Sequence, residues 1–434
     1  MTKTSRLRRK EGLHAACAML AGLATVAVLT AASPIHAHAS GVGTDSAEMV
    51  EARIARVTNN LPAGPLGFTW HHSTLADRMA HYRVPAVSIA IIDNYQVEWA
   101  RGFGVVAAGS TQAVTSKTLF QAASISKPLA ALGALLLVEQ GKLFEDEDVN
   151  SLLRNWKLSE NQYTAGNSVT LRELLSHTAG TTVGGFPGYP PSARLPNLVQ
   201  ILDGVPLANT PPVRVDKQPG AGWRYSGGGY MIVQQMVVDV TGETFPEYMQ
   251  DAVLTPLGMS ESTFAQPLLE QLWANAATGT LASGESVGGG WHVYPEMAAA
   301  GLWTTPSDLA KFAIDLMDTQ AGRSGAKLST RAEAQMLTSQ SYAWLLGAFN
   351  GQGIFLTGES DSLRFFHEGS NAGFASFLLG YRSGQGAIIM TNSDNGILLM
   401  DEIARSIAHE YNWPDGAPLI PAGVQGLPIR LLMF

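Results

Sequence analysis

The feature that most limits the fold of this chain is the run 129–138, which reads L-A-A-L-G-A-L-L-L-V. As a helix it would be apolar on every face, so it has to be surrounded by other parts of the protein and is predicted to be a buried central helix. With 434 residues, 46% of them hydrophobic, the chain is long enough to enclose it. Lys127 stands just before the run, and its ammonium is costly to bury without a partner.

A serine lies at helical spacing from this lysine. Ser124 and Lys127 are three residues apart, which places both side chains on one face of a helix. Pro128 is tolerated only in a first turn, so Ser124 is predicted at the helix N-terminus, where the dipole favours developing negative charge. Burial would leave a neutral lysine amine that can take the serine proton. S-x-x-K also arises by chance, and the competing Ser126 is assigned a structural role because it is not one turn from the lysine.

Two later segments combine glycine-rich turns with groups that can exchange protons. Residues 219–230 read P-G-A-G-W-R-Y-S-G-G-G-Y and place Tyr225 between a turn and a predicted helix. Tyr225 could project into a cleft as a base or proton relay, although a packed aromatic is the commoner role. Residues 365–374 read F-F-H-E-G-S-N-A-G-F and lead into a predicted strand. His367 and Gly369 stand at its polar start, where a glycine lets a ligand approach the backbone.

Taken in chain order, these segments resemble those of the serine beta-lactamase and DD-peptidase superfamily. The resemblance is to the branch of class C beta-lactamases, D-aminopeptidases and related esterases, and it covers nearly the whole mature chain. The ordered set is specific, although each piece alone is not. The matching segments are R-V-P-A-V-S-I-A-I-I-D at 83–93, T-L-F-Q-A-A-S-I-S-K at 118–127, L-R-E-L-L-S-H-T-A-G at 171–180, R-Y-S-G-G-G-Y at 224–230, A-A-G-L-W-T-T-P-S-D-L-A-K-F at 299–312 and H-E-G-S-N-A-G-F at 367–374.

The resemblance implies a role for each catalytic residue. Ser124 would be the acylated nucleophile and Lys127 its activator. Tyr225, at the first position of the family's Y-x-N motif, would be the partner base that also helps to deliver water for deacylation. The implied fold is α+β, with a central antiparallel sheet, flanking helices and a helical subdomain, and the site lies between the sheet and the subdomain. No metal or organic cofactor is implied.

The resemblance also implies how the substrate is held. His367 takes the position of the lysine in the family's K-T-G motif, and Gly369 is counted among the residues that bind the substrate. The backbone N–H groups of Ser124 and Ser370 would form the oxyanion hole.

Two departures from the family pattern bear on the substrate. Gly227 replaces the asparagine of Y-x-N, whose amide meets the acylamino group of lactam and peptide substrates. His367 is mostly uncharged at neutral pH and holds a carboxylate less firmly than lysine. An esterase- or amidase-like enzyme with weak recognition of free carboxylates is therefore predicted. The alternatives are a class C beta-lactamase or DD-carboxypeptidase/penicillin-binding protein, and a slow-turnover penicillin-binding or sensor protein.

Strand patterns stand at both ends of the chain, with a mostly helical middle. Strands are predicted at 85–93, 96–104, 374–381 and 387–391. Helices are predicted at 46–59, 171–177, 229–241, 303–317 and 397–411. The pattern indicates an α+β domain over 68–412 with one sheet built from both ends and a helical insertion at roughly 143–345. A connector is predicted at 40–67 and a C-terminal tail at 413–434.

The N-terminus has the pattern of an export signal. Residues 1–14 are basic, residues 15–35 are rich in Ala, Leu and Val, and Ala37-His38-Ala39 is a small-x-small cleavage site. A signal peptide is predicted at 1–39, with an uncleaved anchor as the alternative. The mature protein is expected to be periplasmic or secreted, with no stable membrane span. Arg8-Arg9 hints at the twin-arginine route, although its neighbours match poorly.

Charge and cysteine content exclude several classes of function. Cleavage after residue 39 would change the formal net charge from −8 to −12, because it removes five basic residues and one acidic residue. So acidic a protein is a poor candidate for nucleic acid binding. The only cysteine, Cys17, lies in the signal, so no disulfide or thiolate site is predicted in the mature chain. The expected partner is a small-molecule ester, amide, peptide or beta-lactam, and no oligomeric state is predicted.

Two other patterns could mark a different site. Residues 284–288 read G-E-S-V-G and match the G-x-S-x-G nucleophile elbow around Ser286. That elbow needs a strand before it and a helix after it, so the segment is interpreted as a loop. His71 and His72 are adjacent and share no helix face, and H-E-x-x-H does not occur, so no metal site is predicted. His177 is interpreted as a packed histidine.

Overall fold

A computed structural model describes residues 41–62 and 72–414 of the chain. The described residues from Ala47 onward belong to one compact unit, and only the residues 41–46 that begin the first helix are described in the other unit. The predicted signal peptide, the last part of the predicted connector and nearly all of the predicted tail lie outside the described residues.

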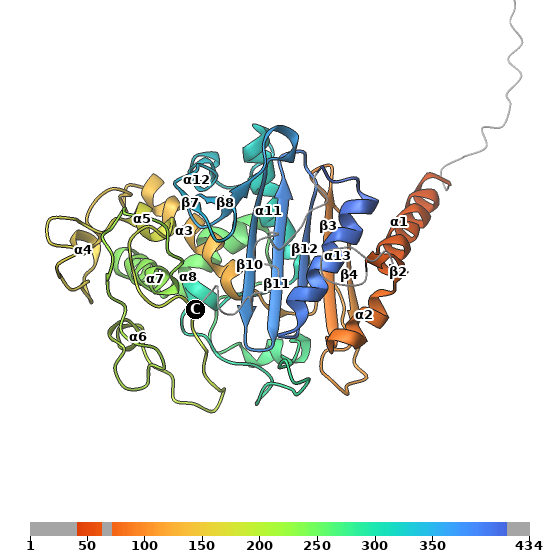
Figure 1. Ribbon diagram of the computed structural model, residues 1–434, viewed down its shortest axis with the longest axis horizontal. Coiled ribbons are helices and arrows are strands. Elements are labelled where there is room, and N and C mark those ends of the chain that lie inside the picture. Colours follow the sequence, from red (N-terminus) through yellow and green to blue (C-terminus); the bar gives the residue numbers. More distant parts are fainter. Residues whose placement is uncertain (1–40, 63–71, 415–434) are drawn as a thin grey trace, which may run out of the picture. The chain divides into compact units, whose positions relative to one another are not determined.

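An antiparallel eight-stranded sheet forms the centre of the compact unit, and its strands come from both ends of the chain (Figure 1). The prediction of an α+β fold is confirmed. In spatial order the strands are β4 (Gln96–Gly104), β3 (Ala86–Asp93), β12 (Gly386–Thr391), β11 (Phe374–Tyr381), β10 (Arg364–Asn371), β9 (Phe355–Thr357), β8 (Ala348–Asn350) and β7 (Ser341–Ala343). Two short pairs lie apart from it, β1 (Leu61–Pro62) with β2 (His72–Ser73) and β5 (Phe120–Gln121) with β6 (Trp303–Thr304).

Helices cover the sheet, and most of the described helices come from the chain between β4 and β7 (Figure 1). The described helices are α1 (Gly41–Asn59), α2 (Leu75–Tyr82), α3 (Ser126–Glu139), α4 (Val149–Leu152), α5 (Leu171–Leu175), α6 (Leu198–Asp203), α7 (Gly227–Thr241), α8 (Phe245–Met249), α9 (Thr255–Leu257), α10 (Met297–Ala300), α11 (Pro306–Ala321), α12 (Thr330–Met336) and α13 (Gly396–Glu410).

Alternating strand residues divide the core between the two faces of the sheet. On β12, Ile389 belongs to a buried cluster with α13, whereas its neighbour Ile388 belongs to the larger cluster that contains α11 and α3. Successive strand side chains point to opposite faces, so both faces of these central strands are apolar and each needs a covering helix. Each fully buried isoleucine contributes roughly 1.5–3 kcal/mol to stability. The layers therefore follow from the apolar runs in the strands.

The predicted central helix is confirmed as α3. All its residues from Ser126 to Leu135 are buried, as is Leu137. Gly133 permits a close approach to α8, because a Cβ atom there would lie 2.7 Å from the sulfur of Met249. The helix ends before Gly141, which has a φ of +69° and donates its N–H to the carbonyl of Val138 at 2.9 Å.

Several predicted elements have different bounds in the structure. The helix predicted at 171–177 ends at Leu175, and His177 has a φ of +57° that a helix does not allow. The helix predicted at 303–317 begins only at Pro306, because Thr305 caps it and accepts the N–H of Asp308 at 3.2 Å. Residues 364–371 form strand β10 itself, so His367 lies within a strand rather than before one.

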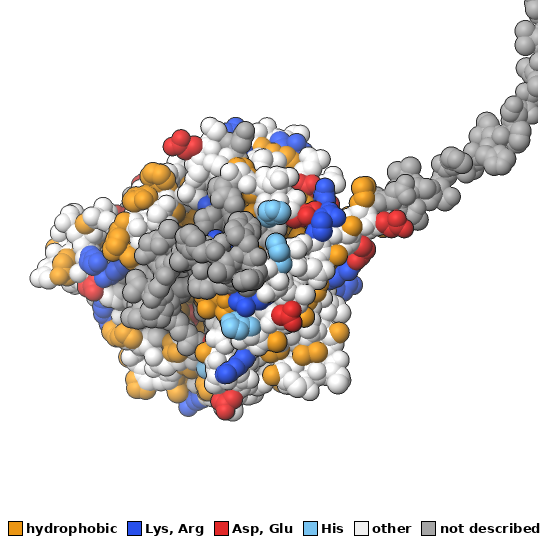
Figure 2. Space-filling model, turned by 45° about the vertical axis from the view of Figure 1, so that its right-hand side comes forward, with side chains coloured by type: hydrophobic (Ala, Val, Ile, Leu, Met, Phe, Trp, Pro, Cys, Tyr) orange, Lys and Arg blue, Asp and Glu red, His pale blue; other side chains and the backbone are white. Residues whose placement is uncertain are grey.

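Part of the predicted connector packs onto the sheet. Ile54 and Val57 of α1 are buried in the cluster that contains α13. Arg53 pairs with Glu98 on the edge strand β4, at 2.6 Å. On the face that Figure 2 shows, Lys and Arg side chains are scattered among other types rather than gathered in one patch.

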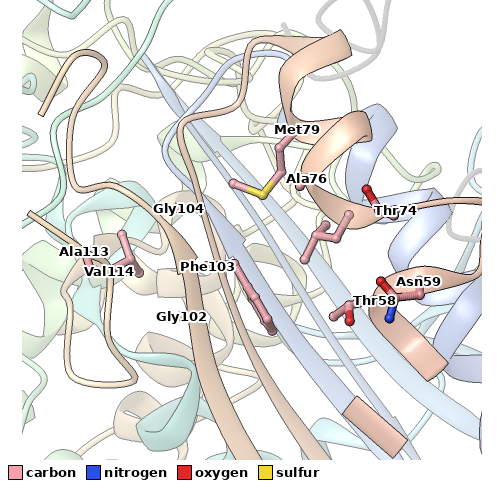
Figure 3. A pocket seen from close by; sticks show the side chains of 11 residues that line it. Thr58, Asn59, Thr74, Ala76, Met79, Gly102, Phe103, Gly104, Ala113 and Val114 are labelled. Atoms are coloured by element: carbon pink, nitrogen blue, oxygen red, sulfur yellow. The ribbon is translucent and has the colours of Figure 1, made fainter. Parts of the chain in front are cut away.

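A cavity of about 530 Å³ lies between the end of α1, helix α2 and strand β4 (Figure 3). Met79, Phe103 and Val114 are among the residues that line it. No lining residue has a titratable side chain, so we assign no chemistry to this cavity.

Candidate active site

Ser124 and Lys127 meet at the start of α3, as the spacing predicts. Ser124 lies in a short 3-10 turn, Ala123–Ile125, that leads into the helix. The Lys127 amine lies 3.0 Å from the Ser124 hydroxyl oxygen and donates to the Ala299 carbonyl at 2.9 Å. Lys127 is only 2% exposed, and burial lowers its pKa to about 7. At neutral pH a large share of this lysine is therefore an uncharged amine that can accept a proton.

The turn that presents Ser124 has a strained backbone. Ala123 has a φ of +50°, which costs energy for a residue with a side chain. Ser126 holds this turn, because its hydroxyl donates to the Ala123 carbonyl at 2.6 Å and accepts the N–H of Leu302 at 3.0 Å. The structural role predicted for Ser126 is confirmed. No sequence signal marks Ala123, since its importance lies in its backbone angles.

Strand β10 closes against this turn through Gly369. A Cβ atom at Gly369 would lie 2.2 Å from the carbonyl oxygen of Ala122, so only glycine fits there. Asn371 reaches the same region and donates its side-chain amide to Gln121 at 2.8 Å and to the Ala300 carbonyl at 3.1 Å. The end of β10 is thereby held against both the serine turn and α10.

Helix α10 provides the carbonyl that binds the Lys127 amine. Gln234 of α7 holds this short helix, because its amide oxygen accepts the N–H of Ala298 at 2.9 Å and its amide nitrogen donates to the Pro295 carbonyl at 3.2 Å. Ala299 is absent from the predicted site because a backbone carbonyl leaves no side-chain signal in a sequence. Its contact with Lys127 depends on how two distant segments pack.

A buried carboxyl group precedes α10. Glu296 has no exposed surface, and neither of its carboxyl oxygens has a hydrogen-bond partner of normal geometry among the described residues. Burial raises its pKa to about 8, while the Tyr189 hydroxyl beside it favours the charged form in part. The group is therefore mostly protonated at neutral pH. Sequence reasoning missed it because a lone glutamate between proline and methionine carries no motif.

Tyr225 lies beside the lysine, at the end of the segment that leads into α7. The Lys127 amine is 4.9 Å from the centre of the Tyr225 ring. The Tyr225 hydroxyl is buried without a hydrogen bond of normal geometry among the described residues. Burial raises the Tyr225 pKa, and the nearby Ser124 hydroxyl offsets only part of that rise. The phenol therefore stays protonated at neutral pH, which favours the relay role over the base role expected from the resemblance.

His177 packs behind Tyr225 and does not reach the serine by any described hydrogen bond. Its ring centre is 4.5 Å from that of Tyr225 and 5.4 Å from that of Tyr230. Its Nδ1 accepts the N–H of Ser226 at 3.2 Å, and burial holds its pKa well below the usual range. The prediction of a packed, satisfied histidine is confirmed.

His367 lies on β10 facing the same side of the sheet as Gly369. It is 2% exposed, and burial, with a contribution from Lys127, lowers its pKa to about 3. Its Nδ1 lies 2.7 Å from the Glu368 carbonyl, which can only accept, so Nδ1 carries the proton of the neutral ring. The Nε2 atom is left as an acceptor, which is the opposite of what a carboxylate needs.

Ser370 follows in the same strand, on the opposite face from Gly369 and paired in register with Ala375. Strand β9 pairs with β10 only from Arg364 to Phe366. No other described strand pairs with that edge of β10 beyond Phe366. The main chain around Ser370 therefore lies along an open strand edge.

The position of the missing asparagine is filled by a neighbouring ring. A Cβ atom at Gly227 would lie 2.8 Å from Cε2 of Phe186 and 3.1 Å from the carbonyl oxygen of Gly184. The same carbonyl accepts the N–H of Gly227 at 3.0 Å, so the loop is tied to the start of α7. Phe186 was not predicted as a site residue, because its place depends on the path of a loop.

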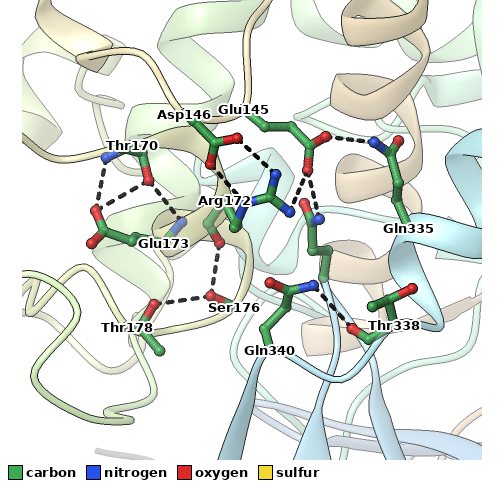
Figure 4. A network of polar contacts seen from close by, with 11 residues as sticks. Glu145, Asp146, Thr170, Arg172, Glu173, Ser176, Thr178, Gln335, Thr338 and Gln340 are labelled. Atoms are coloured by element: carbon green, nitrogen blue, oxygen red, sulfur yellow. Dashed lines mark hydrogen bonds and ion pairs between the residues drawn. The ribbon is translucent and has the colours of Figure 1, made fainter.

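A polar network supports the segment that carries His177 (Figure 4). The Glu145 carboxylate accepts from Gln352 at 2.7 Å and from the amide of Gln335, and it pairs with Arg172 at 3.0 Å. Arg172 also pairs with Asp146 at 2.7 Å. These contacts join α5 and α12 to the residues that follow α3.

Ser286 does not have the geometry that a nucleophile elbow needs. Ser286 is exposed in a tight turn in which the N–H of Leu281 donates to the Glu285 carbonyl at 2.7 Å. No helix follows it, so the interpretation as a loop is confirmed. Among the described residues, no three His, Cys, Asp or Glu side chains are grouped so that they could hold a metal ion. His71 lies outside the described residues.

The family model of Beta-lactamase matches residues 72–411 of this chain. The chain belongs to the beta-lactamase family. This match covers most of the chain and includes all the segments on which the resemblance was based.

Relatives of this beta-lactamase-family protein include penicillin-binding proteins. It is 24% identical to "Penicillin-binding protein 4" of Amycolatopsis lactamdurans over 355 residues, which cover 79% of this chain and 89% of that protein. It is 27% identical to a "Putative D-alanyl-D-alanine carboxypeptidase" of Escherichia coli (strain K12) over 262 residues, which cover 57% of this chain and 59% of that protein.

Solved structures share the fold. D-alanine carboxypeptidase AmpC from Burkholderia cenocepacia superposes with a TM-score of 0.61 and 17% identity, over 82% of this chain and 99% of that chain. The octameric penicillin-binding protein homologue from Pyrococcus abyssi superposes with a TM-score of 0.60 and 23% identity, over 78% of this chain and 76% of that chain. The family match, together with the similarity to a putative D-alanyl-D-alanine carboxypeptidase, identifies a serine hydrolase that acts by acyl transfer. None of the described helices has the length and apolar character needed to cross a membrane.

Proposed function

We propose that this protein hydrolyses neutral esters or amides through an acyl-enzyme on Ser124. The observation that carries the proposal is the contact between the Ser124 hydroxyl and the buried Lys127 amine, 3.0 Å apart. The uncharged amine takes the hydroxyl proton while the serine oxygen attacks the carbonyl carbon of the substrate. The backbone N–H groups of Ser124 and Ser370 are the proposed donors to the resulting oxyanion.

Tyr225 completes the proton transfers in this proposal. When the tetrahedral intermediate collapses, the bond to the leaving oxygen or nitrogen breaks, and that atom takes a proton from Lys127 through the Tyr225 hydroxyl. A water molecule then attacks the acyl carbon and gives one proton to the same pair. When this second tetrahedral intermediate collapses, the bond to the Ser124 oxygen breaks, that oxygen takes the proton back from the pair, and the acid is released. A protonated phenol suits this relay because it donates one proton as it accepts another.

Two features of the site support a neutral substrate. His367 stands where a cation would bind a substrate carboxylate, but it is uncharged with Nε2 as an acceptor. Gly227 offers no amide to an acylamino group, and Phe186 fills the adjoining space. Both features weaken the binding of penicillins and of peptides that end in D-Ala-D-Ala, while the acyl-transfer groups remain.

The names of the relatives favour a second candidate. Proteins named as penicillin-binding protein and D-alanyl-D-alanine carboxypeptidase are similar to this chain, so beta-lactam or DD-peptide hydrolysis is the alternative. A slow penicillin-binding or sensor protein would acylate and then release product slowly.

Export to the periplasm or medium is also part of the proposal, and it is supported by the pattern of residues 1–39 alone.

Steady-state rates on two substrates test the proposal. The protein should hydrolyse p-nitrophenyl acetate with a higher kcat/KM than a chromogenic cephalosporin, and Ser124→Ala should lose both activities. A cephalosporin preference of several orders of magnitude would establish the beta-lactamase alternative. A burst of product without turnover would establish the slow penicillin-binding alternative.

A further inference from the structure

The β7–β8 hairpin is fastened to the segment that holds the proposed relay tyrosine. The side-chain amide of Asn350 donates to the Ser176 carbonyl at 2.6 Å, and the Ser341 hydroxyl lies 3.4 Å from the same oxygen. Ser176 precedes His177, whose ring packs on Tyr225. The hairpin is therefore positioned by the same short segment as Tyr225.

An apolar surface continues from Tyr225 onto this hairpin. Ala343 and Ala348 face inward and form a small buried cluster with Phe355. Four partly exposed residues pack against that cluster, namely Tyr225, Trp223, Leu346 and Phe366. The Trp223 ring centre lies 6.5 Å from that of Tyr225 and 6.4 Å from that of Phe355.

The outer part of the hairpin is aromatic and exposed. Trp344, in its turn, is 68% exposed, and Tyr342 and Phe349 are 53% and 51% exposed. Large exposed aromatic side chains gathered in one place are typical of binding surfaces. The charged residue beside Tyr225 in the chain is Arg224, and it is paired with Asp216 at 2.5 Å. The surface therefore suits an uncharged group.

The proposed mechanism decides which part of a substrate reaches this surface. The leaving oxygen or nitrogen must come within hydrogen-bonding reach of the Tyr225 hydroxyl to collect its proton. A substituent on that atom that extends towards Trp223, whose ring centre lies 6.5 Å from that of Tyr225, would reach the cluster on which Leu346 also packs. In the proposed mechanism the acyl part is held at Ser124 and at the end of β10 that carries Ser370.

We infer that Trp223, Leu346 and Trp344 form a subsite for a bulky apolar leaving group, such as the aryl portion of an ester or amide. This inference rests on the proposed function, because it takes Tyr225 as the relay to the leaving atom. It adds a preference that the acyl-transfer groups alone do not explain, namely a preference for large apolar alcohols or amines.

A pair of acetate esters tests the subsite. Phenyl acetate and 2-naphthyl acetate form the same acetyl-enzyme, so a difference in kcat/KM between them reports on the leaving group alone. The protein should prefer 2-naphthyl acetate by about tenfold, from the extra apolar area buried. Trp344→Ala and Leu346→Ala should each lower kcat/KM for 2-naphthyl acetate by about three- to tenfold and lower kcat/KM for phenyl acetate by a smaller factor, because its single ring fills less of the subsite.

Leu398→Ala is the matched control, since Leu398 is 46% exposed on α13, which packs in the cluster on the other side of the sheet. It should change neither ester. If the hairpin variants lower both esters equally, or lower neither, the subsite is refuted while the proposed function stands. If Ser124→Ala keeps the phenyl acetate rate, the proposed function fails, and the subsite fails with it. If Leu346→Ala folds poorly, Leu346→Val takes its place. Leu346→Val should lower kcat/KM for 2-naphthyl acetate by a smaller factor.

Discussion

The ring of Phe186 occupies the space into which a side chain at residue 227 would extend. A Cβ atom on Gly227 would meet Cε2 of Phe186 at 2.8 Å, a distance that real Cβ atoms essentially never show. The asparagine that the resemblance implies at this position would therefore not fit here without a movement of the loop that carries Phe186.

This relationship predicts a coupling between the two positions. Gly227→Ala should lower the free energy of unfolding by about 1–3 kcal/mol through overpacking. In a Phe186→Ala background the same change should cost much less, because the ring that it meets is gone. Urea unfolding of the four proteins of this cycle measures the coupling. Gly288→Ala is the control, since a Cβ atom there has no neighbour within 4 Å. If Gly227→Ala lowered the free energy of unfolding equally with and without the Phe186 ring, the packing described here would be contradicted.

The lowered pKa of Lys127, about 7, predicts the pH dependence of catalysis. Only the uncharged amine can take the serine proton, so kcat/KM should fall about tenfold per pH unit below pH 7 and level off above it. His367, with a pKa of about 3, should not contribute to this limb, and His367→Ala should leave its midpoint near pH 7. A rate that stays flat from pH 5 to pH 8 would rule out Lys127 as the base.

Ser124 and Ser126 should behave in opposite ways when each is replaced by alanine. Ser124→Ala removes the proposed nucleophile and should lower kcat by about 10⁴-fold or more with little change in stability. Ser126→Ala removes two buried hydrogen bonds and should cost about 1–3 kcal/mol of stability, with partial activity retained because the nucleophile remains. Thermal unfolding and ester hydrolysis measured on both variants separate the two roles. Full loss of activity in Ser126→Ala, with Ser124→Ala active, would reverse the assignment.

The raised pKa of Glu296 predicts a loss of stability with rising pH. Between pH 4.5 and about 8 the unfolded chain releases this proton while the folded protein keeps it, so the free energy of unfolding falls as pH rises. The limit is about 1.4 kcal/mol per pH unit. Glu296→Gln removes the titration, so the variant should gain stability relative to the parent at pH 8 compared with pH 5. If the difference in free energy of unfolding between Glu296→Gln and the parent were the same at pH 5 and at pH 8, a buried protonated carboxyl would be contradicted.

Local signals explain which parts of the site could be predicted. The Ser124–Lys127 spacing, the apolar helix behind it and the first strands were predictable because each depends on residues close in sequence. Strand β10 was less visible because Glu368, Ser370 and Asn371 interrupt its apolar pattern. The short strands β7 to β9 were not predicted at all, since two or three residues carry little periodicity.

The remaining parts of the site depend on contacts between distant segments. The Ala299 carbonyl, the backbone angle of Ala123 and the ring of Phe186 have no signal in the sequence, because each acts through its position in the folded chain. The charge state of His367 was foreseen from the ordinary pKa of histidine, but its tautomer follows from the Glu368 carbonyl that its Nδ1 meets. A sequence does not show that contact.

The central claim is that Ser124 becomes acylated, and covalent labelling tests it most directly. The protein would be treated with an aryl fluorophosphonate, digested, and mapped by mass spectrometry, beside Ser124→Ala and Lys127→Ala. The label should lie on Ser124, should be absent in Ser124→Ala, and should form far more slowly in Lys127→Ala. Labelling of Ser126 or Ser286 at the rate of the parent protein, with Ser124 unmodified, would contradict the account.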